Sequence, residues 1–82
     1  MTRNELFACI YIILSKHDVH GKLQLCRMVN ECARGVYMCD KSTYTRMTDL
    51  LKILKSERMI CIIPCWKHKF RHDLIYLCRE YK

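Results

Sequence analysis

The chain contains few residues that interrupt regular structure, with one proline and two glycines among its 82 residues. The composition is 51% hydrophobic, which argues against intrinsic disorder. A loop-rich disulfide mini-protein is also disfavoured, because such a protein needs more turn residues. No repeat, linker or low-complexity tract divides the sequence, so we expect residues 1–82 to form a single small domain.

Long apolar runs are absent as well. The apolar stretch 6–14 is too short for a membrane-spanning helix, which needs roughly 20 residues. Glu5 precedes this stretch, the polar segment SKHDVH follows it, and no small-residue cleavage site of a signal peptide is visible. We therefore expect an intracellular, cytoplasmic protein without a membrane partner.

The sequence lacks the signatures of common catalytic sites. It has no Gly-rich phosphate loop, no Gly-x-Ser-x-Gly motif and no pair of acids in a recognisable frame. Seven cysteines and four histidines allow a Cys/His nucleophile pair, but their abundance makes that pairing uninformative. We expect no enzymatic activity, no cofactor and no small-molecule ligand.

Cysteine is the residue present in excess, and its number is odd. In a secreted protein, seven cysteines suggest a disulfide framework with one unpaired thiol. Inside a cell they suggest buried thiols, metal ligands, or the disulfides found in intracellular proteins of hyperthermophiles. Cys26 and Cys32 are expected to be buried thiols. The sequence leaves open whether Cys9 or Cys39 forms a disulfide, either within one chain or between subunits.

Positive charge is concentrated in the second half of the chain. Residues 41–82 carry ten Lys and Arg against four acids, whereas residues 1–40 carry five against four. A basic surface confined to one part of a small domain indicates a polyanionic partner, with nucleic acid as the first candidate. A solvated helix face would show the same excess, so charge alone does not decide.

The N-terminal segment has the pattern of a helix over about residues 3–16. Its apolar residues recur on one face, namely Leu6, Phe7, Ile10, Ile13 and Leu14. Ala8 and Ile12 lie on the opposite side, and a small monomer can cover only one of these faces. We expect Ala8 and Ile12 to form a two-fold homodimer interface, although one exposed apolar residue is also common in monomers.

The next segment predicts a second helix. A polar connection with a short strand near 22–24 leads into a helix over 24–34, which ends before Gly35. The residues on its expected core face are Leu25, Cys26, Val29, Cys32 and Ala33.

A third helix is predicted after a turn over 36–40. It begins near Ser42, whose hydroxyl is a candidate N-cap, and ends near Glu57. The residues expected to face the core are Tyr44, Met47, Leu50, Leu51 and Leu54.

Beyond Glu57 the pattern changes to that of a β-hairpin. The Ile-rich run 59–66 is typical of a strand with Pro64 at an edge position, and 74–78 would return after a loop over 67–72. A helix over 66–81 is the alternative. Trp66, Phe70, Leu74, Leu77 and Tyr81 also fit a helical stripe, and the expected loop has no Gly or Asn to favour a tight turn.

Three segments carry a resemblance to a known family. They are LQLCRMVNECA as the second helix, STYTRMTDLLKILKSERMI as the third, and CIIPCWKHKFRHDLIYLC as a terminal hairpin. Together they resemble the winged helix-turn-helix family of DNA-binding proteins over almost the whole chain. The resemblance implies an α+β fold, a three-helix winged helix-turn-helix with a C-terminal two-stranded β-hairpin wing. It also implies a sequence-specific transcriptional regulator that binds double-stranded DNA.

The size and cysteine content are similar to those of small regulators encoded by viruses of hyperthermophilic archaea. The sequence departs from the family pattern in three places. The link GVYMCDK is longer than the tightest helix-turn-helix connections, the wing tip has no glycine, and no helix is expected after the second wing strand. Many dimeric members pair through such a helix, so dimerisation here would fall to the first helix.

The resemblance implies a set of DNA-contacting residues. Those expected to read bases from the third helix, about 42–57, are Ser42, Thr43, Thr45, Arg46, Thr48 and Asp49. Arg46 is the strongest candidate, because a guanidinium can contact guanine bidentately. Lys41, Lys52 and Lys55 are expected to neutralise phosphates. Lys67, Lys69 and Arg71, in a wing over about 66–73, would follow the backbone or enter the minor groove.

Cys61, Cys65, His68 and His72 form the pattern C-x3-C-x2-H-x3-H, whose residue types suit zinc. The middle spacing is far shorter than in a zinc finger, and on a strand Cys61 and Cys65 would lie about 13 Å apart. Zinc binding therefore requires a strand break at Pro64, or a helix over 66–81 that places His68 and His72 one turn apart.

Two other functions fit the same sequence. A small protein-interaction or inhibitor module would use the scaffold without DNA, and a zinc-stabilised nucleic-acid-binding module would use the Cys/His set. The pattern as a whole favours the dimeric DNA-binding regulator.

Overall fold

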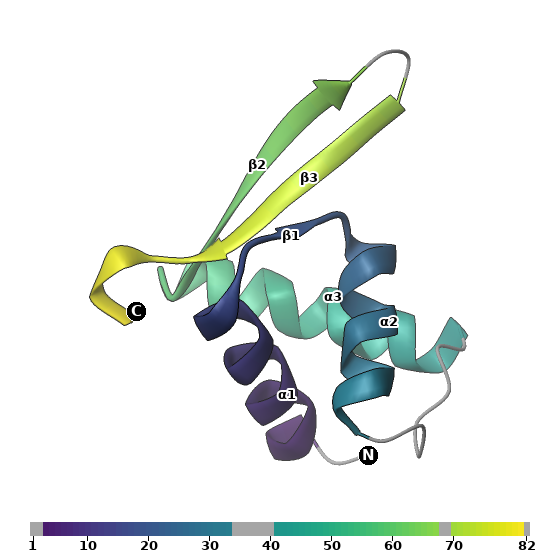
Figure 1. Ribbon diagram of the computed structural model, residues 1–82. Coiled ribbons are helices and arrows are strands. Elements are labelled where there is room, and N and C mark those ends of the chain that lie inside the picture. Colours follow the sequence, from purple (N-terminus) through teal and green to yellow (C-terminus); the bar gives the residue numbers. More distant parts are fainter. Residues whose placement is uncertain (1–2, 34–40, 68–69, 82) are drawn as a thin grey trace.

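Residues 3–33, 41–67 and 70–81 are described by the computed structural model. These residues form three α-helices and a three-stranded antiparallel sheet, so the expected α+β class is confirmed (Figure 1). In chain order the elements are α1 (Arg3–Lys16), β1 (Val19–His20), α2 (Lys22–Cys32), α3 (Lys41–Ser56), β2 (Ile60–Lys67), β3 (Phe70–Leu77) and a 3-10 turn, η1 (Arg79–Tyr81).

Helix α1 has the bounds that its apolar repeat predicts. Glu5 in the first turn and Lys16 in the last turn complement the helix dipole. The buried residues are Leu6, Ile10, Ile13 and Leu14, whereas Phe7 is only partly buried. One face of the helix therefore packs on the core, and the opposite face, which carries Ala8 and Ile12, is exposed.

The connection between α1 and α2 differs from the prediction. The strand expected near 22–24 is wrong, because β1 lies earlier, at Val19–His20, and α2 already begins at Lys22. Gly21 sits between them with φ of 103° and ψ of 151°, a conformation open essentially to glycine alone. Its N–H donates to the carbonyl oxygen of Asp73 over 2.7 Å, which attaches the start of α2 to β3.

Two residues expected in the core are exposed. Cys32 lies in the last turn of α2, beyond the buried stripe formed by Leu25, Cys26 and Val29. Tyr44 lies in the first turn of α3 and is 36% exposed, because the core contact of that helix begins only at Met47. Helix α3 also starts one residue before Ser42, which therefore lies inside its first turn.

Strands β2 and β3 pair antiparallel from Ile60 opposite Leu77 to Lys67 opposite Phe70. The alternative helix over 66–81 is therefore wrong, and the loop expected over 67–72 is too long. Lys67 belongs to β2 and Phe70–His72 belong to β3, since the ladder continues along both strands. Residues 34–40, which include the expected stop at Gly35 and the turn after it, lie outside the described residues.

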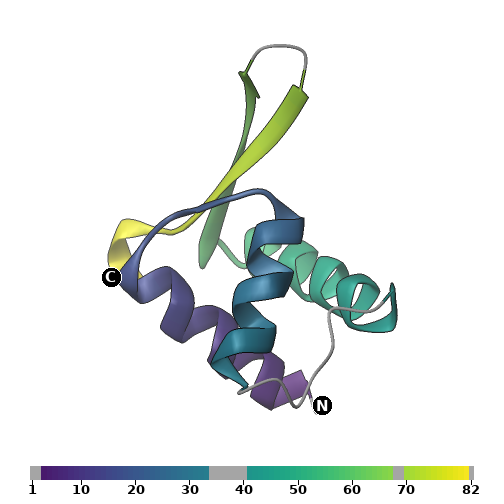
Figure 2. The ribbon, with the colours of Figure 1, turned by 45° about the vertical axis from the view of Figure 1, so that its right-hand side comes forward.

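The sheet has the strand order β1-β3-β2, so β3 is central and the hairpin is part of a three-stranded sheet rather than a separate pair. Pro64 lies in the edge strand β2, as its missing N–H requires. Val19, Ile60, Ile75 and Leu77 are buried against the helices. The far end of the hairpin extends away from the helices (Figures 1 and 2).

We predict that Gly21→Ala destabilises the protein by about 1–3 kcal/mol. A Cβ at this position would meet no atom within 4 Å, so the cost arises from the backbone conformation and not from a clash. Urea unfolding followed by circular dichroism measures the change. Glu31→Ala, at an exposed position of α2, is the control and is expected to cost less than about 0.5 kcal/mol. Equal stabilities of the two variants would contradict the strain at Gly21.

Candidate nucleic-acid interface

Helix α3 presents most of the predicted DNA-contacting side chains to solvent. Its exposed residues include Lys41, Ser42, Thr45, Arg46, Asp49, Lys52 and Lys55, whereas Thr43 and Thr48 are half-buried. The opposite face is fixed in the core by Met47, Leu50, Leu51 and Leu54. Burial of these four residues determines which side of α3 faces outward.

The outward residues of α3 fall into three stripes at helical spacing. Thr45, Asp49 and Lys52 lie opposite the core and form the outer stripe. A second stripe runs from Tyr44 through Thr48 to Lys55 on one flank. A third runs from Arg46 to Ile53 on the other flank. Arg46, the strongest candidate from sequence, therefore lies on the opposite flank from Tyr44.

Two threonine hydroxyls already have partners within α3. Thr45 Oγ1 donates to the carbonyl oxygen of Lys41, and Thr48 Oγ1 donates to that of Tyr44, each over 2.9 Å. A hydroxyl that donates its proton in this way keeps its lone pairs for accepting. In this arrangement both threonines present acceptors, and not donors, to any bound partner.

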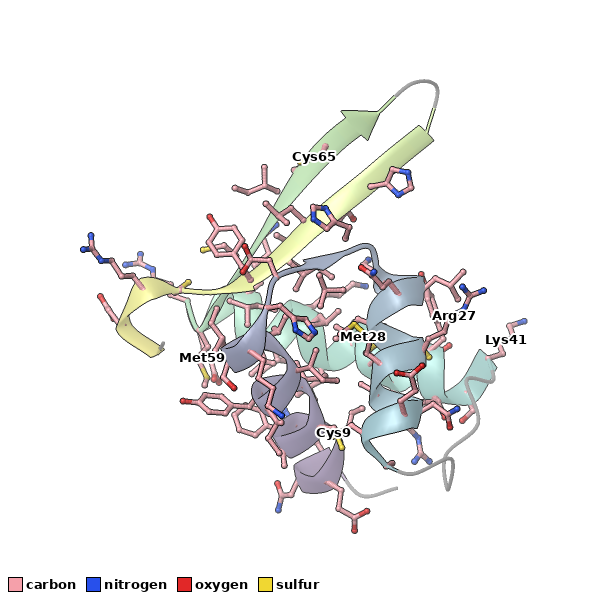
Figure 3. All side chains as sticks on the ribbon, viewed as in Figure 1. Cys9, Arg27, Met28, Lys41, Met59 and Cys65 are labelled. Carbon is pink, nitrogen blue, oxygen red and sulfur yellow. The ribbon has the colours of Figure 1, made fainter. Side chains whose placement is uncertain are left out.

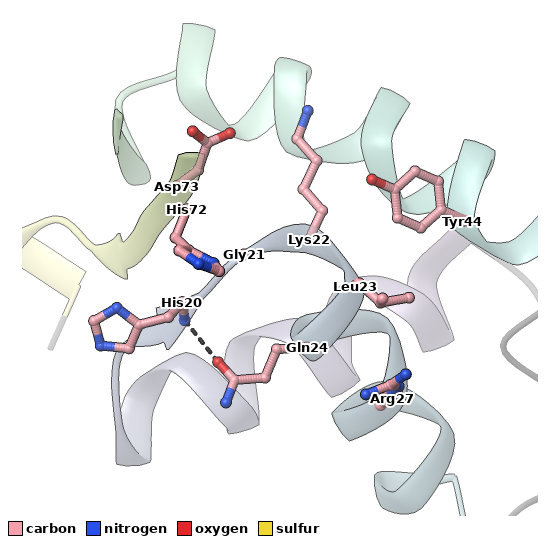
Figure 4. Close-up of a pocket in the computed structure, with 9 residues that line it drawn as sticks. All are labelled: His20, Gly21, Lys22, Leu23, Gln24, Arg27, Tyr44, His72 and Asp73. Atoms are coloured by element: carbon pink, nitrogen blue, oxygen red, sulfur yellow. Dashed lines mark hydrogen bonds between the residues drawn. The ribbon is translucent and has the colours of Figure 1, made fainter. Parts of the chain in front are cut away.

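A cleft of about 710 Å³ opens beside α3, between the start of α2 and strand β3 (Figure 4). We call it the α2–β3 cleft. Its lining residues are His20, Gly21, Lys22, Leu23, Gln24, Arg27, Tyr44, His72 and Asp73. Lys22 and Arg27 supply positive charge, and Lys22 extends between Asp73 and Tyr44 in Figure 4. Elements from both halves of the chain thus contribute to one cleft.

Two hydrogen bonds join residues that line this cleft. The side-chain Oε1 of Gln24 accepts a hydrogen bond of 2.7 Å from the backbone N–H of His20 (Figure 4). The hydrogen bond from the Gly21 N–H to the Asp73 carbonyl oxygen joins the start of α2 to β3. These two contacts fix the position of the first turn of α2 relative to the sheet.

Lys22 and Arg27 line the cleft but are not among the residues that the sequence pattern predicts. Both lie in residues 1–40, where acids nearly balance the cations, so the charge asymmetry along the chain does not indicate them. Arg27 from α2 and Lys41 from α3 are both exposed, and both extend on the right-hand side of Figure 3. Only their placement in the fold brings these cations into one region.

The structure describes the backbone of two of the three hairpin residues that are predicted to contact DNA. Lys67 ends β2 and Arg71 lies in β3 opposite Trp66. Lys69 lies outside the described residues. The hairpin and α3 therefore supply the predicted residues from two separate elements, with the α2–β3 cleft beside the first turn of α3.

Zinc binding by the Cys/His pattern C-x3-C-x2-H-x3-H requires a strand break at Pro64 or a helix over 66–81, and the structure has neither. Strand β2 runs through Pro64 without a break, and residues 70–77 form a strand and not a helix. Cys61 and Cys65 therefore stand four strand residues apart, which is too far for one metal. His68 lies outside the described residues, and the described part of the chain contains no group of three His, Cys, Asp or Glu side chains able to hold a metal.

A second, smaller concavity lies between α1 and α3. This α1–α3 groove of about 330 Å³ is lined by Arg3, Asn4, Phe7, Leu50, Ile53, Leu54, Glu57 and Met59. Ile53 is 36% exposed there, and Phe7 and Met59 are only partly buried. The groove is therefore more apolar than the α2–β3 cleft and carries both a cation and an acid.

Comparison with protein-family models, with curated proteins and with solved structures finds no match to this chain. Among the described residues, no helix is long and apolar enough to span a lipid bilayer.

We predict that removal of divalent metal leaves the fold intact. Treatment with excess EDTA should not shift the midpoint of thermal unfolding measured by circular dichroism, because β2 separates Cys61 from Cys65. A structural zinc site would contribute folding free energy directly, so chelation would lower the midpoint sharply. Such a drop, together with stoichiometric zinc in the purified protein, would contradict the prediction.

Proposed function

We propose that the chain is a winged helix-turn-helix protein that binds double-stranded DNA in a sequence-specific manner and regulates transcription. The observation that carries the proposal is the outer face of α3, which is polar and basic and adjoins the α2–β3 cleft lined by Lys22 and Arg27. A helix fits the major groove, and cations at its flanks fit the adjacent phosphates. In this proposal the β2–β3 hairpin is the wing.

The N-terminal half of the outward side of α3 would face the base edges. Thr45 and Thr48 would accept hydrogen bonds from base amino groups, because their own protons are used within the helix. Asp49 would accept from a cytosine amino group. Arg46 would reach guanine from the flank of the helix, and Ser42 and Thr43 would contact DNA near the helix start.

The cations around this face would bind phosphates. Lys41, Lys52 and Lys55 lie on α3, and Lys22 and Arg27 line the α2–β3 cleft, from which they would reach the same duplex. Each neutralised phosphate releases condensed counterions, so affinity would fall steeply as salt rises. Lys67, Lys69 and Arg71 would follow the backbone or enter the minor groove from the hairpin.

A homodimer would place two recognition helices on two half-sites. Ala8 and Ile12 lie on the exposed face of α1, and Ile12 is 45% exposed. Packing of two such faces about a two-fold axis would bury both residues. The DNA target would then be palindromic, with half-sites one helical turn apart.

We predict that Lys52→Ala and Arg46→Ala weaken DNA binding in different ways. After selection of bound duplexes from a random pool, Lys52→Ala should weaken all duplexes alike and reduce the salt slope by about 1. Arg46→Ala should weaken the binding free energy for the selected site by about 1–3 kcal/mol and relax the sequence preference at one base pair. Fluorescence anisotropy over a salt series measures both effects.

Lys16→Ala is the matched control, because Lys16 is exposed at the end of α1 and lies outside the proposed interface. Its affinity and salt slope should stay close to those of the unaltered protein. Unchanged affinity in both Lys52→Ala and Arg46→Ala at all salts would rule out α3 as the recognition helix.

We predict that Ile12→Glu converts the dimer to a monomer, because the new carboxylate would be buried in an apolar interface. Sedimentation velocity measures the change in mass. His17→Glu, at an exposed position just beyond α1, introduces the same charge and should leave the dimer intact. A monomeric unaltered protein at micromolar concentration would contradict the proposed α1 interface.

A protein-binding function is the second candidate, and the α1–α3 groove is the observation that favours it. Its exposed Ile53 and partly buried Phe7 and Met59 provide apolar contact area away from the outer stripe of α3. If no duplex is enriched by selection while Ile53→Asp abolishes binding to a protein partner, this function replaces DNA binding.

A further inference from the structure

Two cysteines meet where the β2–β3 hairpin joins the helical part of the molecule. Cys61 is the second residue of β2, and Cys78 follows the last residue of β3. Their sulfur atoms are 3.0 Å apart, although the residues are separated by 17 positions in the sequence. A disulfide bond is about 2.05 Å long, so the two thiols need to approach by only roughly 1 Å.

The sheet register explains this proximity. Cys61 lies opposite Tyr76, and Cys78 lies two residues beyond Tyr76 along the same strand direction. Side chains two residues apart in a strand project from the same face, so Cys78 is the diagonal neighbour of Cys61. The ladder therefore places both sulfurs on the same side of the sheet.

Backbone contacts hold both residues at this position. The N–H of Cys78 donates to the carbonyl oxygen of Met59 over 2.9 Å, which extends the pairing beyond Leu77. The neighbouring Ile60 and Leu77 are each 2% exposed and are fixed in the core. The thiols are therefore held together by the same packing that anchors the hairpin.

We propose that Cys61 and Cys78 form an intramolecular disulfide that covalently closes the root of the β2–β3 hairpin. Both side chains are half-buried, so a small disulfide reagent can reach them. This proposal is independent of the DNA-binding function, because it concerns a covalent modification and its effect on stability.

The reaction is a thiol–disulfide exchange with a low-molecular-weight disulfide, RSSR. The Cys61 thiolate attacks one sulfur of RSSR and releases RS⁻, which gives a mixed disulfide. Cys78 then loses its proton and attacks the Cys61 sulfur, and the second RS⁻ leaves. The two cysteine thiols are oxidised by two electrons in total, and RSSR is reduced to two RSH.

The environment of the Cys78 thiol is consistent with its attack in the second step. The hydrogen bond to Cys61 raises the pKa of Cys78, and partial burial raises it further. A hydrogen bond to Cys61 also raises the pKa of Tyr76. A raised pKa keeps the Cys78 thiol protonated to higher pH, which is consistent with its attacking second.

Other cysteines offer internal comparisons. Burial and then a hydrogen bond to the Cys32 thiol raise the pKa of Cys9, so these two residues form a second neighbouring pair between α1 and α2. Cys65 lies four residues along β2 from Cys61 and faces His72 across the ladder. A specific cross-link must therefore be distinguished from oxidation at these sites.

The test is disulfide mapping of the full chain after equilibration with oxidised glutathione. Free thiols are alkylated and the protein is cut with trypsin without reduction. Lys67 and Arg71 lie between Cys61 and Cys78, so a disulfide would keep the peptides 59–67 and 72–79 joined. Because 59–67 also contains Cys65, the mapping is repeated in Cys65→Ser, where the joined peptides should persist.

Cys61→Ser and Cys78→Ser should each abolish the joined peptides. In Cys65→Ser, oxidation should raise the midpoint of thermal unfolding by several degrees, and reduction with dithiothreitol should reverse the rise. Fully alkylated Cys61 and Cys78 after equilibration would overturn the proposal. A link confined to Cys9 and Cys32, or one that joins Cys65 to Cys78, would overturn it as well. If a serine variant fails to fold, fragment-ion sequencing of the joined peptides from the unaltered chain shows whether Cys61 or Cys65 carries the alkyl group and decides between the two links.

Discussion

The hydrogen bond from Gly21 to Asp73 is the contact on which the arrangement of this molecule depends, because it joins the helices to the sheet. It secures the short strand β1 to β3, and it fixes where α2 begins. Val19, beside it, is fully buried. The same attachment places the first turn of α2 beside β3, where both elements line the α2–β3 cleft.

The parts of the fold that could be predicted from sequence are those with local periodicity. The apolar repeat of α1 gives its bounds, and the change of period after Glu57 identifies the β-hairpin. Burial along α3 also follows its apolar spacing from Met47 onward. In each case neighbouring residues in the chain carry the information, and no distant partner is needed.

The errors occurred where a distant partner decides the structure. The start of α2 depends on the conformation of Gly21 and on Asp73, which is far along the chain. Tyr44 and Cys32 continue the helical stripes but lie beyond the reach of the core. Lys22 and Arg27 were overlooked because net charge along the chain does not reveal which cations meet in space.

Edge strand β2 also has a consequence for how copies of the protein behave together. An exposed sheet edge is a template on which another chain can add a strand, and the hydrophobic residues of β2 make it well suited to do so. Pro64 interrupts that template, because it offers no N–H to an incoming strand. Pro64, which marks the edge in the sequence, therefore also disfavours strand addition at that point of β2.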